Sequence, residues 1–160
     1  MNKKGQIFGM SFTTIFSILL IIAFIIIAFI AIRYFLGIGE CSEVGLFYRD
    51  LQEEVDDIYF GGQVVDKGFE IKLPSGIGKV CFANLSEKIT NQEDYSAMDA
   101  GNKNHNVFLV LFQKACNLGS NKINHINMTE ITKNSNPWCV DVSRELRLKK
   151  DFYDKYVRIE

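Results

Sequence analysis

The chain begins with one long stretch of apolar residues. Between Ile15 and Ile32 every side chain is apolar except that of Ser17, and no charged residue occurs between Gly5 and Ile32. With the residues just before it, this stretch is long enough to cross a bilayer core of about 30 Å as a helix that rises about 1.5 Å per residue. Its apolar residues lie on every side, which excludes an amphipathic surface helix. We therefore predict a transmembrane helix over residues 12–36.

The flanks of this helix predict its retention and its orientation. A cleaved secretory signal peptide has a shorter apolar core, about 7–15 residues, followed by small residues. Here the stretch is longer and ends at residues 33–36, Arg-Tyr-Phe-Leu, so we expect the helix to be retained. The two lysines before the helix, Lys3 and Lys4, outnumber the one basic residue directly after it, which favours a cytoplasmic N-terminus. Residues 1–11 are then a cytoplasmic basic leader, and residues 37–160 form an exported domain.

A second, amphipathic helix is predicted over residues 42–59. Its apolar side chains recur at helical spacing, and acidic residues occupy much of the other side. The apolar positions are Val44, Phe47, Tyr48, Leu51, Val55 and Ile58. The ring of Tyr48 can join this stripe while its hydroxyl reaches a polar partner or water. Gly61 and Gly62 are a stop signal. Residues 37–39, Gly-Ile-Gly, predict a flexible joint, or one long bent rod if the joint is mild.

Beyond the glycines the pattern becomes that of strands. Within residues 68–83, two alternating stretches flank a Pro-Ser-Gly turn, which predicts a β-hairpin. Residues 106–113 contain a continuous apolar run, typical of a central strand buried on both faces. Three closing strands are predicted within residues 138–159. The polar, Asn-rich segments 84–106 and 117–137 are expected to form loops or short helical turns.

Together these elements predict an α+β fold, with a long N-terminal transmembrane helix followed by an amphipathic helix packed on an antiparallel β-sheet. The chain has 160 residues, which is room for one domain of ordinary size. Its 18 Lys and Arg residues nearly balance 19 Asp and Glu residues, for a net charge of −1. A general nucleic-acid binder needs a basic surplus, so we expect no nucleic-acid partner. The composition also excludes a fully soluble globule, a multi-domain enzyme and a disordered chain.

Four residues, Lys3, Lys4, Gly5 and Gln6, stand directly before the apolar helix. This order resembles the leader of archaeal type IV pilin-like proteins, the class III signal peptide. The resemblance implies that a membrane prepilin peptidase cuts after Gly5, so that Gln6 becomes the new N-terminus and the two lysines are the basic leader positions. Bacterial pilins carry a glutamate five residues into the mature chain, where this chain has Met10. Many archaeal relatives also lack that glutamate.

The resemblance implies a structural, non-enzymatic function. The apolar helix would sit in the lipid bilayer and then pack against copies of itself or other pilin-like subunits in a filament or pseudopilus. The candidate small residues for such helix contacts are Ser17, Ala23, Ala28 and Ala31. The alternative is a single-pass cell-surface binding module whose signal anchor is not cut. An ectoenzyme is a third and more distant hypothesis.

The cysteines and two glycosylation triplets are consistent with export. An even number of cysteines in a small exported domain predicts disulfides, and the spacings contain no zinc motif. The cysteines are Cys41, Cys81, Cys116 and Cys139, which allow three pairings. Buried free thiols in a cytoplasmic domain are the alternative. Asn84 and Asn127 begin N-x-Ser/Thr triplets and are candidate glycan sites in an exported domain.

The titratable residues predict no catalytic or metal site. The densest acidic group is expected to be the solvated face of the amphipathic helix, since no calcium-binding loop surrounds it. Its members are Glu53, Glu54, Asp56 and Asp57. The only two histidines, His105 and His125, lie in Asn-rich sequence and are expected in exposed loops. Because no nucleophile elbow, phosphate loop or dinucleotide fingerprint is present, we predict neither an enzyme nor a cofactor.

Overall fold

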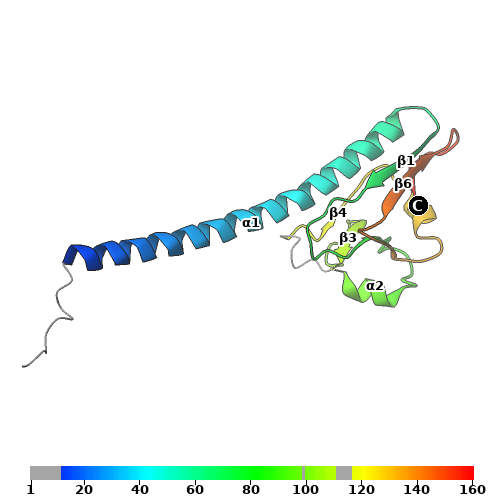
Figure 1. Cartoon of the computed structure of the whole chain (residues 1–160). Coiled ribbons are helices and arrows are strands. Elements are labelled where there is room, and N and C mark those ends of the chain that lie inside the picture. Colours follow the sequence, from blue (N-terminus) through cyan, green and yellow to red (C-terminus); the bar gives the residue numbers. More distant parts are fainter. Residues whose placement is uncertain (1–11, 99, 111–116) are drawn as a thin grey trace, which may run out of the picture. The chain divides into compact units, whose positions relative to one another are not determined.

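The computed structural model describes residues 12–98, 100–110 and 117–160, and the described part is an α+β chain (Figure 1). The chain divides into two compact units, Met1–Ile38 and Gly39–Glu160. Helix α1, Phe12–Phe60, begins in the first unit and ends in the second.

In the first unit, helix α1 exposes its apolar side chains on all sides. The large apolar residues from Ile15 to Leu36 are between 43 and 70 % exposed. The hydroxyl of Ser17 donates to the Thr13 carbonyl oxygen at 2.8 Å, so this polar group is satisfied within the helix. Among the described residues, one helix, α1, is long and apolar enough to cross a membrane. The predicted transmembrane segment is therefore helical, and its large apolar side chains are exposed in the part of the chain that the structure describes.

The predicted joint at residues 37–39 is wrong, because these residues are helical and belong to α1. Helix α1 instead continues through these residues without a break, which is the alternative that the sequence left open. Helix α1 ends where the sequence predicts, at the glycine pair. The Gly61 N–H donates to the Asp57 carbonyl oxygen at 2.9 Å, and a Cβ on Gly61 would lie 2.7 Å from that oxygen. Gly62 has φ of +63°, the left-handed conformation that ends helices and favours glycine.

The second unit contains two short helices and two antiparallel sheets besides the end of α1 (Figure 1). One sheet has three strands in the order β1-β6-β7, and the other has four in the order β4-β3-β2-β5. The elements after α1 are β1 (Val65–Glu70), β2 (Lys79–Phe82), α2 (Gln92–Ala97), β3 (Val107–Val110), β4 (Ser120–Asn121), α3 (Met128–Ile131), β5 (Trp138–Asp141), β6 (Glu145–Lys150) and β7 (Arg158–Ile159).

The predicted hairpin within residues 68–83 is wrong, although both of its strands exist. Strand β1 pairs with β6, whereas β2 pairs with β3 and β5 in the other sheet. Eight residues separate Glu70 from Lys79, more than the two to five of an ordinary hairpin loop, so the chain has room to change sheets. The turn at Pro74 is real, since the Ile77 N–H donates to the Pro74 carbonyl oxygen at 3.3 Å.

The other strand predictions are confirmed. Strand β3 lies between β4 and β2, and its four residues are all buried, as expected of a central strand. The rest of that apolar run, residues 111–113, lies outside the described residues. Strands β5, β6 and β7 are the three closing strands. Short helices α2 and α3 and the two-residue strand β4 lie within the Asn-rich segments.

The apolar stripe of α1 forms part of the main core. All six of its residues are at most 4 % exposed and share one cluster with apolar residues of both sheets. A smaller cluster around Cys81, Phe108 and Met98 lies apart from the main one. Neighbouring residues Val80 and Phe82 belong to the main cluster, so strand β2 contributes to both clusters. Strand β3 also contributes to both clusters, through Val107 and Leu109 on one face and Phe108 on the other, which explains why its sequence is a continuous apolar run.

The prediction for Tyr48 is only half right. Its ring is buried in the stripe, but its hydroxyl has no hydrogen-bond partner among the described residues. Burial raises the pKa of this hydroxyl far above its ordinary value. The helical period places the ring correctly, whereas the hydroxyl's surroundings depend on which segments fold over it.

A disulfide joins an inner strand, β2, to the edge strand β5 of the four-stranded sheet. Cys81 on β2 and Cys139 on β5 are directly opposite in the antiparallel register, with Cα atoms 4.0 Å apart. Their separation in sequence is 58 residues. Cys41 is also disulfide-bonded, and Cys116 lies outside the described residues. Of the three pairings that four cysteines allow, the one that contains Cys81–Cys139 joins Cys41 to Cys116.

Asparagine side chains organise the segments that lack regular structure. Asn106 makes two hydrogen bonds to the backbone of Ile123, each 2.8 Å long, and so joins two distant segments. Asn91 and Asn127 are the N-caps of α2 and α3, where each side-chain oxygen accepts a backbone N–H. The richness in asparagine therefore has a structural cause, because its amide both donates and accepts.

Asn136 is the most connected of these asparagines and is 2 % exposed. Its side-chain oxygen accepts from the Asn84 N–H at 3.1 Å, and its amide nitrogen donates to the Asn84 and Lys88 carbonyl oxygens at 2.9 and 3.2 Å. Its own N–H donates to the Thr90 hydroxyl at 2.8 Å. One side chain thus holds residues 84–90 against the loop before β5.

Removing the β2–β5 disulfide should lower stability. We expect the double variant Cys81→Ala/Cys139→Ala to lose about 4 kcal/mol of unfolding free energy, because the bond closes a 58-residue loop. Urea unfolding of the full chain in detergent, followed by the fluorescence of Trp138, measures the change. Peptide mapping of the non-reduced chain should recover Cys81 linked to Cys139 and Cys41 linked to Cys116. A loss below about 1 kcal/mol would contradict the expectation.

Asn136→Ala should also destabilise the second unit. The substitution leaves the backbone groups of Asn84 and Lys88 without these partners in a buried site, which costs about 2–4 kcal/mol. The same urea titration tests this expectation. Asn134→Ala is the matched control, because Asn134 is exposed and close in sequence, and it should change stability by less than about 0.5 kcal/mol. Equal effects of the two substitutions would count against the role of Asn136.

Candidate functional site

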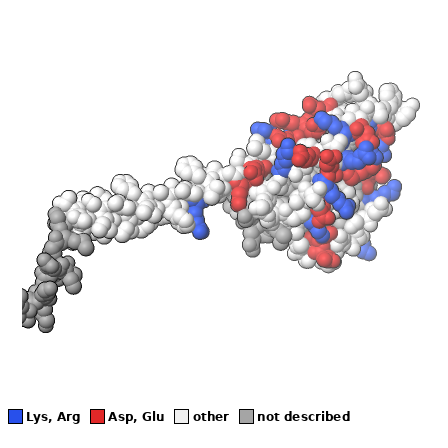
Figure 2. All heavy atoms as spheres, in the orientation of Figure 1, with Lys and Arg blue, Asp and Glu red and all other residues white. Residues whose placement is uncertain are grey.

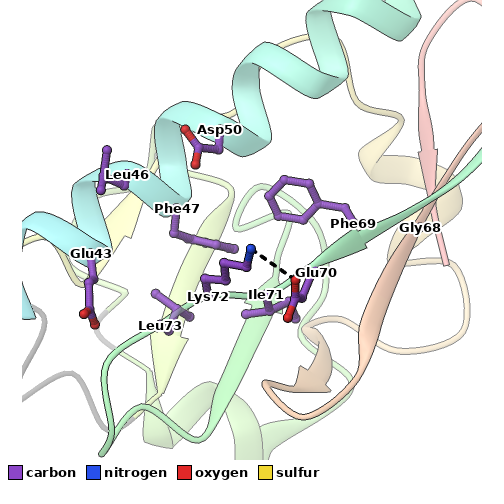
Figure 3. Close-up of a pocket in the computed structure, with 10 residues that line it drawn as sticks. All are labelled: Glu43, Leu46, Phe47, Asp50, Gly68, Phe69, Glu70, Ile71, Lys72 and Leu73. Atoms are coloured by element: carbon purple, nitrogen blue, oxygen red, sulfur yellow. Dashed lines mark ion pairs between the residues drawn. The ribbon is translucent and has the colours of Figure 1, made fainter.

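A groove of about 640 Å³ lies between α1 and the edge of β1 in the second unit (Figure 3). One wall is the α1 surface around Phe47, and the other is β1 with the segment that follows it. The lining residues are Glu43, Leu46, Phe47, Asp50, Gly68, Phe69, Glu70, Ile71, Lys72 and Leu73.

The floor of the groove is apolar. The rings of Phe47 and Phe69 lie with their centroids 6.2 Å apart, one from each wall. Phe47 is buried, Phe69 and Leu73 are half-buried, and Leu46 is 40 % exposed at the opening. Figure 3 shows Phe47, Phe69 and Leu73 between the helix and the strand segment. An apolar ligand surface that enters the groove therefore finds partly uncovered carbon atoms to contact.

The rim of the groove is acidic. Lys72 forms an exposed ion pair with Glu70 at 3.2 Å (Figure 3), and Asp50 pairs with Arg49 at 2.8 Å outside the groove. No ion pair to Glu43 is present among the described residues. Exposed pairs of this kind contribute little to stability and exchange partners easily.

The backbone of β1 is unpaired where it borders the groove. Arg147 on β6 exchanges two hydrogen bonds of 2.9 Å with Glu160 on its other side, so it has none left for its β1 partner, Gly68. The N–H and C=O groups of Gly68 therefore point away from β6, to the open edge of the sheet. Glu70 lies two residues further along β1, so its backbone N–H and C=O groups face the same open edge.

Two carboxylates lie beside this open edge on the outer face of the sheet. Glu70 and Glu145 are directly opposite each other in the β1–β6 register, which places like charges together. The Glu145 carboxylate also covers Gly68, since a Cβ there would lie 2.8 Å from its oxygen. The sequence analysis missed the groove, because Phe69, Ile71 and Leu73 indicate a strand but not which element faces them.

Some of the acidic side chains of α1 have specific partners and are not simply a solvated face. Glu54 pairs with Lys67 on β1 at 2.5 Å, and Glu53 lies 3.7 Å from Arg49. Asp56 accepts a hydrogen bond of 2.8 Å from the Gln52 amide. In the part of the chain that the structure describes, no three His, Cys, Asp or Glu side chains gather as metal ligands do. The Glu54 pair attaches β1 to α1, whereas the contacts of Glu53 with Arg49 and of Asp56 with Gln52 lie within the helix.

His125 lies in a loop, as predicted, but it is half-buried rather than exposed. Its ring stacks on Tyr59, with centroids 4.0 Å apart and planes 7° apart, and its Nδ1 lies 2.7 Å from the Asp56 carboxylate. Its φ of +62° turns the chain at this point. Histidine and carboxylate do meet, as an ectoenzyme requires, but His125 does not line the groove. The contact fastens the loop before α3 to the end of α1.

The His105 ring also contacts two neighbouring side chains. Its Nε2 lies 2.9 Å from the Asn102 amide nitrogen, and its Nδ1 lies 2.9 Å from the Ser120 hydroxyl. The Asn102 side-chain oxygen accepts from the Asn104 N–H, so its amide nitrogen is the group that donates to Nε2.

The remaining predicted site residues are the two candidate glycan positions and the leader. Asn84 and Asn127, the candidate glycan positions, are both half-buried and use their side-chain oxygens in local turns or caps. The amide nitrogen of Asn84 donates to Glu87 at 2.9 Å. The leader residues Lys3, Lys4, Gly5 and Gln6 lie outside the described residues.

Charges on the visible surface of the second unit are mixed. Figure 2 shows acidic and basic side chains interspersed over it, whereas most of α1 in the first unit carries neither. In comparisons with known proteins, no family model, no curated protein and no solved structure matched the chain. The function is therefore argued from the chain's own residues.

The His125–Asp56 contact should be measurable as a coupling energy. We expect a double-mutant cycle of Asp56→Ala and His125→Ala in urea unfolding to give about 0.5–1 kcal/mol, because both side chains are partly exposed. The matched control cycle pairs His125→Ala with Glu53→Ala, one turn away on α1, and should give no coupling. Additive effects in the Asp56 cycle would show that the contact does not hold the loop.

Proposed function

We propose that the chain is a membrane-anchored, exported structural subunit of the pilin-like kind. The observation that carries this proposal is the segment of α1 from Ile15 to Leu36, whose large apolar side chains are all at least 43 % exposed. An apolar surface of this extent is stable only in lipid or against other apolar helices. A helix satisfies its own backbone hydrogen bonds and is therefore suited to both surroundings.

Small residues on one side of this helix support lateral packing. At 100° per residue, Ser17, Ala28 and Ala31 fall within about 60° of one another around the axis, whereas Ala23 lies outside this sector. Small side chains let helix backbones approach closely in a membrane, where apolar contact alone gives little drive for association. The Ser17 hydroxyl is already bonded to Thr13, so the sector presents no unsatisfied donor. Copies of this chain, or related subunits, are the proposed partners.

The leader and the disulfides support export. The N-terminal lysines favour a cytoplasmic N-terminus, which puts the second unit outside the cytoplasm. The Cys81–Cys139 bond suits the oxidising conditions found there. A prepilin peptidase that cuts after Gly5 would then release the helix for assembly into a filament or pseudopilus.

A single-pass surface binding module is the second candidate. The groove between α1 and β1 favours it, because an open strand edge beside an apolar floor is a recurrent way to bind peptides. In that case the same helix remains an uncut anchor. The two candidates differ in the fate of the leader, which makes the N-terminus the feature to measure.

The mass of the N-terminal peptide tests the proposal. We expect peptides that begin at Gln6, enriched in material sheared from cells relative to whole membranes. Gly5→Val should leave the N-terminus at Met1 or Asn2 and abolish release by shearing, because the small residue before the cut is lost. Gly9→Val, also within the N-terminal segment, is the matched control and should still be cut. A wild-type chain that keeps Met1 or Asn2 and occurs only in membranes would contradict the proposal and favour the binding module.

A further inference from the structure

We propose that the open edge of β1 binds an extended peptide in which apolar and basic residues alternate. The peptide adds a fourth strand to the β1-β6-β7 sheet and fills the groove beside α1 (Figure 3). This inference is independent of the filament hypothesis, since it concerns only the second unit.

The backbone of the edge supplies the first part of the recognition. The N–H and C=O groups of Gly68 point away from β6 and make no hydrogen bond to any described residue. Glu70 continues the same orientation. Such a row of unpaired groups is a template for a further strand. The added strand pairs through its own backbone, so this part of the recognition sets position but not side-chain identity.

The two sides of the added strand meet different chemistry. One side lies over the groove, where Leu46, Phe69 and Leu73 leave apolar surface uncovered. The opposite side lies next to Glu70, which forms an exposed ion pair with Lys72, and near the Glu145 carboxylate that covers Gly68. Side chains of a strand alternate between its two sides, so the matching peptide alternates apolar with basic residues. A basic residue on that side of the added strand brings positive charge near both carboxylates.

Gly68 is the residue that makes the edge accessible. It presents no side chain on the outer face, where the Glu145 carboxylate comes within 2.8 Å of the position a Cβ would occupy. That carboxylate is the end of a flexible, exposed side chain and can move aside. Proline at this position removes the N–H that faces the edge but none of the hydrogen bonds to β6. Alanine adds the same Cβ and keeps the N–H.

Fluorescence anisotropy with the full chain in phosphatidylcholine nanodiscs tests the proposal. The probe is a fluorescein-labelled hexapeptide that alternates arginine and valine, and empty nanodiscs are the blank. We expect saturable binding, at least about tenfold tighter than that of a peptide with three valines followed by three arginines. Gly68→Ala should retain affinity within about twofold, and Gly68→Pro should weaken it at least about tenfold. Glu70→Gln/Glu145→Gln should weaken binding severalfold.

The remaining outcomes overturn the proposal. Equal binding of the alternating and block peptides would show general electrostatic attraction instead. Equal affinity of Gly68→Ala and Gly68→Pro, with the Cys81–Cys139 bond intact in both, would exclude strand addition. If the alternating peptide does not bind while Gly68→Pro abolishes self-association of the chain, the occupant is a second copy. None of these results depends on whether the leader is cut.

Discussion

The burial of one stripe of helix α1 is the interaction on which the second unit depends. Val44, Leu51 and Val55 have no exposed surface, and they share a single apolar cluster with residues from both sheets. Burying each such side chain contributes about 1.5–3 kcal/mol, which exceeds the contribution of any exposed ion pair in the unit. The polar contacts of α1 act around this stripe. Lys150, for example, donates to the Tyr59 carbonyl oxygen at 2.6 Å and so caps the last turn of the helix.

The same helix has two different kinds of surface along its length. Between Ile15 and Ile32 its side chains are apolar in every direction except at Ser17, which suits a surrounding of lipid or apolar helices. From Val44 onward only one face is apolar, which suits packing against a sheet with water on the other side. The glycines between these segments do not interrupt the helix, because glycine weakens a helix by only about 1 kcal/mol per residue.

The edge of β1 and the apolar helix suggest different roles for the two units. The helix offers a surface without specific polar groups, suited to close packing against similar helices. The β1 edge offers backbone groups, an apolar floor and two opposed carboxylates, which can distinguish one peptide from another. The two histidines and the asparagines, by contrast, direct their polar atoms inward to other segments of the unit. For this reason the groove, and not a histidine, is the better candidate for recognition.

The sequence by itself determined the elements whose signal is local. The apolar run, the stripe from Val44 to Ile58, the stop at Gly61 and the buried run at β3 all follow from periodicity and turn chemistry. Which residues pair across long separations in the chain was decided only by the tertiary structure. The pairing of β1 with β6, the Cys81–Cys139 bond and the contact of His125 with Asp56 join residues separated by 58 to 85 positions. The groove arises from the first of these pairings, because it exists only where β1 leaves one edge open. A local pattern shows which side of a strand is apolar, but the packing of the whole unit determines which residue faces that side.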